Sequence, residues 1–111
     1  MTVSSDSILV LTTESVPGRS VREALGLVRG STVRAKHVGA DIVSGLRNIV
    51  GGEMREYAQL LAGSREQALD RMTQEAVALG ADAVVAVRFE TSTIREGASE
   101  VIAYGTAIKL D

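Results

Sequence analysis

Cysteine and tryptophan are absent from this sequence, and it has one proline, one phenylalanine and one histidine among 111 residues. Without cysteine the chain has no disulfide, no thiolate nucleophile and no thiolate metal ligand. Phe89, Tyr57 and Tyr104 make up the whole aromatic content. The core must therefore be built from Val, Leu, Ile and Ala.

Strong charge and long apolar runs are also missing. The net charge is −2 and the basic residues are scattered, which argues against a nucleic-acid binder. No run approaches the ~20 apolar residues of a membrane-spanning helix, and residues 1–7 do not resemble a signal peptide. We expect a cytoplasmic protein that binds neither nucleic acid nor membranes.

The length of the chain fits a single domain over residues 1–111. Periodicity predicts an α+β fold, with an antiparallel sheet of about four strands in ββααββ order and one short and one long helix. A chain this small buries a limited share of its surface, so oligomerisation would be a natural supplement. The expected strands lie at 8–13, 21–35, 83–90 and 100–110, and the expected helices at 39–50 and 53–79.

The long helix has the clearest pattern. Its apolar residues fall on one face, and its charged residues lie largely off that stripe. Gly63 and Ser64 are a weak point, and we predict one continuous helix with a flaw there. Gly80 suits a left-handed end to the helix. The predicted stripe comprises Tyr57, Leu61, Ala68, Met72, Ala76 and Leu79.

The last strand shows two apolar faces. One face is bulky and includes Tyr104, while the other is small and consists of Val101, Ala103, Gly105 and Ala107. Small apolar residues on a second face predict close packing by a helix or by another subunit. In the preceding strand, alternation places Val85, Val87 and Phe89 on one face and Arg88 and Glu90 on the other.

Four blocks of the sequence resemble the YbjQ-like family. They are the segments DIVSGLRNIVGG (41–52), GLVRG (26–30), ALGADAVV (78–85) and YGTA (104–107). The resemblance implies an α+β fold with an antiparallel sheet and a ring-shaped homo-oligomer of a bacterial protein, with a pentamer favoured. Members are often labelled as heavy-metal-binding domains, but where some relatives have a cysteine in the second strand this chain has Leu25.

Metal binding depends on one histidine. His37 is the only soft or borderline ligand, and Asp41 follows it by four residues. The simpler interpretation is a surface histidine. The alternative is a divalent-metal site formed by His37 with Asp41, or by copies of His37 around a ring axis. No cofactor other than such a metal is expected.

Most other candidate residues favour a structural or interface role. Asp41 can cap the short helix, and Arg47 can pair with a carboxylate within or between subunits. Gly51 and Gly52 precede the long helix without a phosphate-binding motif, so a plain turn is favoured. Asp82 is expected to bond local backbone in a turn rather than to act as an acid. Tyr104 and Gly105 complete this set.

We therefore expect a self-assembling, non-enzymatic binding or scaffold protein. Covalent catalysis is disfavoured because there is no cysteine and no serine stands at a recognisable spacing from the histidine. The first alternative is a metal-binding module that uses His37 and carboxylates. A weaker alternative is a small enzyme or sensor whose site lies at a subunit interface, where Arg47 would face a pocket.

Overall fold

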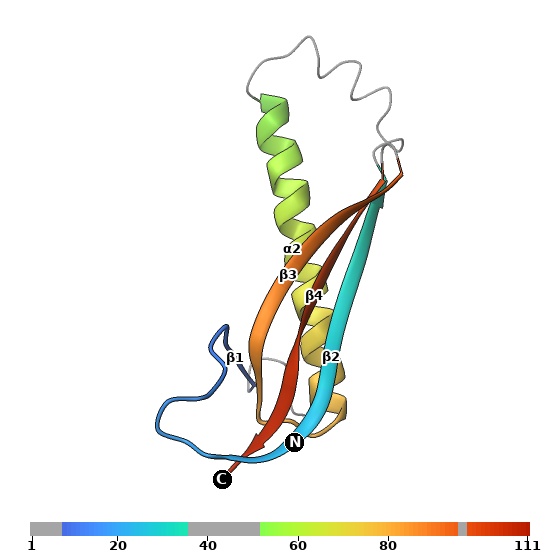
Figure 1. The fold of residues 1–111 in the computed structure, drawn as a ribbon. Helices are drawn as coiled ribbons and strands as arrows, with labels where there is room; N and C mark the ends of the chain where they lie inside the picture. Colours follow the sequence, from blue (N-terminus) through green and yellow to red (C-terminus); the bar gives the residue numbers. More distant parts are fainter. Residues whose placement is uncertain (1–7, 36–51, 96–97) are drawn as a thin grey trace.

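The computed structural model of the chain describes residues 8–35, 52–95 and 98–111. One sheet of four strands has α2 packed across one of its faces (Figure 1). The predicted α+β class is confirmed, and the short helix predicted over 39–50 lies outside the described residues. The elements are β1 (Leu9–Val10), β2 (Val21–Ala35), α2 (Gly52–Ala78), β3 (Ala83–Arg95) and β4 (Ala98–Leu110).

The sheet is mixed rather than purely antiparallel. Its strand order is β1-β3-β4-β2, with β4 antiparallel to both β2 and β3. The two-residue β1 pairs parallel to β3, so the prediction of an antiparallel sheet is wrong at that edge. The reason lies in the connections: only β3 and β4 are joined by a hairpin, while the chain reaches β3 from β1 through β2 and α2.

α2 is one continuous helix that runs through Gly63 and Ser64, as predicted. Ala68, Met72 and Ala76 are fully buried, which confirms the centre of the predicted stripe. Leu79 departs from it because the helix ends at Ala78, and its side chain is exposed. Gly80 follows with a φ of 78°, the left-handed conformation expected at a helix end.

The helix and β2 approach each other at Gly30. A Cβ at this position would collide with the main chain of Ala68 and of Met72. Two polar contacts flank the close approach: the Thr32 hydroxyl donates to the Ser64 carbonyl at 3.1 Å, and Arg71 Nη1 donates to the Ser31 carbonyl at 2.6 Å. A glycine in the strand thus lets an ordinary helix lie directly on the sheet.

The small face of β4 is covered by α2. Val101, Ala103 and Ala107 are buried in the same core cluster as Ala68 and Met72. The prediction left a helix and a second subunit as alternatives, and the structure places the helix there. An uncovered small-residue face is therefore no longer a reason to expect self-assembly.

A bulge in β3 changes which residues share a face. Ala86 has a φ of 54° and interrupts the β3–β4 register between Val85 and Arg88. Its N–H donates to the Thr13 carbonyl at 2.7 Å. Val85 therefore packs on one face of the sheet and Val87 on the other, under α2. The predicted shared face is correct for Val87 and Phe89 and wrong for Val85, because a bulge inserts one extra residue and reverses the alternation beyond it.

Candidate functional site

The sheet face opposite α2 is covered only at one end. There Val16, from the segment between β1 and β2, is buried against Val85, Ile108 and Leu110. Beyond it no described residue covers the sheet, and we call this part the open face. It consists of Leu27, Arg29, Ser31 and Val33 of β2, Glu100, Ile102, Tyr104 and Thr106 of β4, and Arg88, Glu90 and Ser92 of β3.

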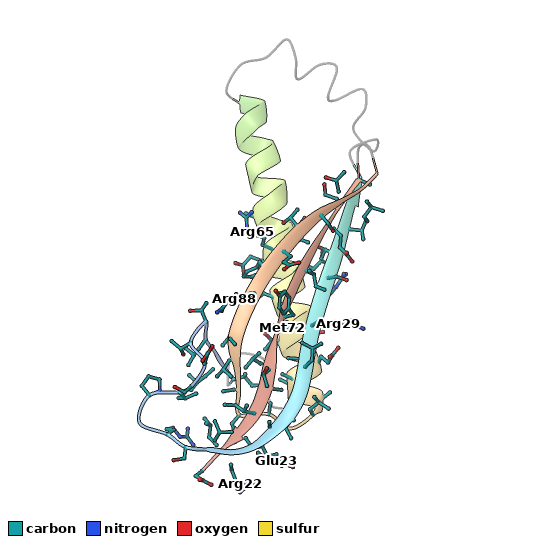
Figure 2. All side chains as sticks on the ribbon, viewed as in Figure 1. Arg22, Glu23, Arg29, Arg65, Met72 and Arg88 are labelled. Atoms are coloured by element: carbon teal, nitrogen blue, oxygen red, sulfur yellow. The ribbon has the colours of Figure 1, made fainter. Side chains whose placement is uncertain are left out.

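Tyr104 stands at the centre of the open face between two arginines. It pairs with Arg29 on β2 and with Arg88 on β3, and Figure 2 labels these two arginines on the strands that flank β4. The Tyr104 hydroxyl donates to Glu90 Oε1 at 3.1 Å. Arg88 Nη1 donates to the Thr12 and Val87 carbonyls, both at 2.9 Å, so Arg88 is held by main chain. Arg29 makes no hydrogen bond or ion pair with the described part of the chain.

The pKa of Tyr104 is raised above the ordinary value of 10.0 for a tyrosine side chain. The hydrogen bond to Glu90 is the main cause, followed by desolvation and by the negative charge of Glu90, while the positive charge of Arg88 acts in the opposite direction. The cluster therefore keeps Tyr104 as a neutral hydrogen-bond donor at neutral pH. Nothing in this arrangement activates a nucleophile or supplies an acid.

In a Tyr57→Phe background, the Tyr104 phenol should titrate at a higher pH than a free tyrosine. Because the folded pKa is the higher one, the contribution of this bond to stability is complete below pH ~10 and is lost as the pH rises through the folded pKa. Glu90→Gln should return the pKa toward its ordinary value. Ultraviolet absorbance of the phenolate measures the titration of Tyr104 in the Tyr57→Phe protein with and without Glu90→Gln. Identical titration curves would contradict the assignment of Glu90 as the cause of the raised pKa.

Apolar side chains frame the cluster. Leu27 is 63% exposed and Val33 is 54% exposed on β2, while Ile94 near the end of β3 is 56% exposed. Ile102 lies half-buried between the two strands. An aromatic residue, two arginines and aliphatic neighbours are typical of protein–protein contact surfaces rather than of catalytic sites.

Four of the predicted site residues cannot be placed. His37, Asp41, Arg47 and Gly51 lie outside the described residues. Across the ranges that the structure does describe, no group of three or more His, Cys, Asp or Glu side chains could hold a metal ion. The described helix is not apolar enough to cross a membrane.

The remaining predicted residues have defined positions and do not converge. Gly52 is the first residue of α2. Gly105 faces the helix, where a Cβ would lie 2.8 Å from Val84 Cγ1, whereas its neighbour Tyr104 is on the open face. Asp82 Oδ2 accepts a hydrogen bond from the Leu110 N–H at 2.9 Å, so its carboxylate fastens the end of β4 rather than a neighbouring peptide.

Sequence reasoning placed Arg88 and Glu90 on one face of β3 but did not connect them with Tyr104 or Arg29. Alternation within each strand was the available signal. It cannot show which residues stand side by side, because that depends on the strand order and on the bulge at Ala86.

The comparisons with known proteins agree on one family. The YbjQ family model, described as "Putative heavy-metal-binding", matches residues 8–111. A UPF0145 protein of Archaeoglobus fulgidus is 60% identical over 103 residues, which is 93% of this chain and 95% of that protein. A UPF0145 protein of Thermus thermophilus is 52% identical over 104 residues, covering 94% and 91% of the two chains. Relatives thus occur in archaea as well as in bacteria, which leaves the expected bacterial origin open.

One solved structure supports the fold. A crystal structure of a protein of unknown function from Pediococcus pentosaceus, assigned to the DUF74 family, superposes with a TM-score of 0.63 at 15% identity. The match covers 94% of this chain and 98% of that one. On the evidence of the family model and of relatives that are half or more identical, the chain belongs to the YbjQ-like (UPF0145) family.

Proposed function

We propose that this protein is a self-assembling, non-enzymatic binding or scaffold protein whose unit is a ring, with a pentamer favoured. The observation that carries the proposal is the open face. It exposes Leu27 and Val33 beside Tyr104, in a chain whose helix is already committed to the opposite face. Exposed aliphatic residues grouped around an aromatic residue mark a surface that is buried against another protein.

The shape of the chain supports the same proposal. Its principal-axis extents are 56 × 28 × 24 Å and its Cα radius of gyration is 17.3 Å. A compact domain of this length has a radius of about 13 Å. An elongated chain buries less of its own apolar surface, so assembly provides burial that the single chain lacks.

Light scattering coupled to size-exclusion chromatography tests the proposal on the full chain at micromolar concentration. We expect a multiple of the chain mass, and native mass spectrometry then counts the subunits. A mass equal to one chain across the concentration range would overturn the proposal. A discrete ring other than a pentamer would correct the subunit number only.

The family label supports a second candidate, a metal-binding module. The ligands would include His37 and Asp41, with one copy contributed by each subunit. Titration calorimetry with zinc, copper and nickel should then show binding that is lost in His37→Ala. Absence of heat above dilution, or unchanged binding in His37→Ala, would reject this candidate. The Asp41→Asn variant tests the second ligand separately.

A further inference from the structure

We infer that neighbouring subunits join edge to edge, with β2 of one copy pairing in parallel with β3 of the next copy. The inference rests on the proposed function, because it names the strand edges at which the self-assembling chain meets its own second copy. The open faces of joined copies then lie side by side on one face of the extended sheet. Each subunit then uses two different edges of its sheet, one on β2 and one on β3.

Both edges are open among the residues that the structure describes. β2 is the last strand in the order β1-β3-β4-β2, and its 15 residues pair only with β4. On β3, β1 pairs with Ala83 and Val84, and the following segment reaches as far as Val87 and Arg88. From Phe89 onward no strand of the described residues pairs with that edge. Long open edges present unpaired N–H and C=O groups that another strand can satisfy.

The direction of pairing follows from the topology. β2 and β3 are both antiparallel to β4, so they run parallel to each other within one sheet. A second copy that extends the sheet with its helix on the same face keeps this orientation, and its β3 lies parallel to β2 of the first copy. Such a contact joins unlike surfaces, which is the kind of interface that repeats around a ring when the rotation closes.

The charges of the strands favour pairing of β2 with β3 of another copy over pairing of two copies of β2. From Ala24 to Ala35, β2 contains Arg29 and Arg34 and no acidic residue. A two-fold β2–β2 pair would bring these arginines together, and like charges across a strand pair are unfavourable. From Phe89 to Ile94, β3 contains Glu90 and no basic residue. Parallel pairing of β2 with β3 in the register that sets Val33 beside Ile94 places Arg29, which has no partner in the described chain, beside Glu90, four residues back on each strand.

Phe89 supplies an independent reason. It lies opposite Ala103, on the face that α2 covers, yet it is 43% exposed. α2 packs mainly on β2 and β4 and leaves this part of β3 uncovered. In the proposed assembly the neighbour's β2 brings its own α2 alongside. That helix would cover Phe89, the only phenylalanine of the chain.

Engineered disulfides test the pairing directly, because the native chain has no cysteine. Val33→Cys on β2 is combined in turn with Glu90→Cys, Ser92→Cys and Ile94→Cys on β3. These positions step along the β3 edge and cover the registers that the open length allows. Under mild oxidation we expect at least one double variant to form a ladder of linked chains longer than a dimer on non-reducing gels.

Two controls make the result specific. Val33→Cys alone should stay unlinked, since the proposed interface does not bring two β2 strands together. A Glu14→Cys, Gln74→Cys variant, with both positions exposed and neither of them on an open strand edge, should form no ladder. An oligomer by light scattering with no ladder in any double variant, or dimers from Val33→Cys alone, would overturn edge pairing while self-assembly stands. A native chain that is monomeric would overturn both.

Phe89→Ala gives a second readout without a new bond. We expect the concentration at which half the chains are assembled to rise at least about tenfold, as for an interface anchor. Leu79→Ala removes an equally exposed apolar side chain at the end of α2 and should leave assembly unchanged. If Phe89→Ala and Leu79→Ala both fold and assemble equally, Phe89 does not lie in the interface and the proposed placement of the neighbouring helix is wrong.

Discussion

Gly30→Ala is expected to destabilise the chain by on the order of 3 kcal/mol, the upper part of the range for overpacked cores. The added methyl group would meet the main chain of Ala68 and Met72, and Arg71 Cβ lies beside them. Main-chain atoms inside a helix cannot rotate away as a side chain can, so α2 itself has to move from β2. Urea unfolding followed by circular dichroism measures the effect at one fixed protein concentration, because assembly adds to apparent stability.

Gly63→Ala is the matched control. The same methyl group is added, but apart from the adjoining backbone of α2 and the two neighbouring residues no atom lies within 4 Å of the new Cβ, and the position is exposed. Replacing glycine by alanine in a helix interior stabilises by roughly 0.5–1 kcal/mol. The two substitutions should therefore have opposite signs. A Gly30→Ala variant as stable as the native chain would mean that α2 and β2 do not touch here.

The packing of helix on sheet was largely predictable from sequence. The apolar stripe of α2 and the small face of β4 are each visible as a period, 3.6 in the helix and 2 in the strand. Gly26 and Gly30 interrupt an expected strand, as glycine does at a bulge or where another element approaches closely. The structure has a register shift at Gly26 and the close approach of another element at Gly30. Only the identity of that element was open, since a period shows that a face is buried and does not show against what.

The bulge and the parallel β1 could not be predicted. Ala86 is an ordinary helix-forming residue with nothing in its type to indicate a positive φ, and two residues are too few for β1 to show any pattern. Both features depend on contacts with the segment that follows β1, including the bond from the Ala86 N–H to the Thr13 carbonyl. Such long-range contacts override local preference.

The same limit applies to the candidate site. Arg29, Arg88, Glu90 and Tyr104 come from three strands, and they meet only because β4 lies between β2 and β3. In the sequence, Arg29 is an arginine near glycines, and Arg88 and Glu90 are polar residues that alternate with apolar ones. Both patterns are common on solvated strands. The strand order turns them into one surface.

Fold and proposed assembly use different surfaces of the chain. The covered face and α2 hold the fold, whereas Val33 and Phe89 on the two free edges contribute little to it because their side chains are 54% and 43% exposed. Variants at Val33 or Phe89 should therefore change assembly while the stability of the single subunit changes by no more than about 0.5 kcal/mol per exposed site. This separation allows the interface to be tested without unfolding the subunit.

Met72→Ala is the second substitution with a large expected effect. Met72 is the largest fully buried side chain of the described residues and lies between α2 and the sheet (Figure 2). Truncating a buried methionine removes its burial and leaves a cavity, which together cost about 2–5 kcal/mol. Met72→Leu nearly conserves the volume and should cost less than about 1.5 kcal/mol. Urea unfolding at fixed concentration compares the two variants, and equal losses would mean that cavity formation is not the cause.

A double variant that combines Gly30→Ala with Met72→Ala separates the contribution of the Met72 side chain from that of the Met72 main chain at the contact with Gly30. The Gly30 collision involves the Met72 nitrogen, which is unchanged when the side chain is shortened. Truncation therefore gives the new methyl group no direct relief. Residues in contact usually couple by about 0.5–3 kcal/mol, so losses that add to within about 0.5 kcal/mol would show that the collision involves main chain alone. A double variant clearly more stable than that sum would show that the helix moves into the space left by Met72. The distance between α2 and β2 would then be set by the methionine side chain rather than by the glycine.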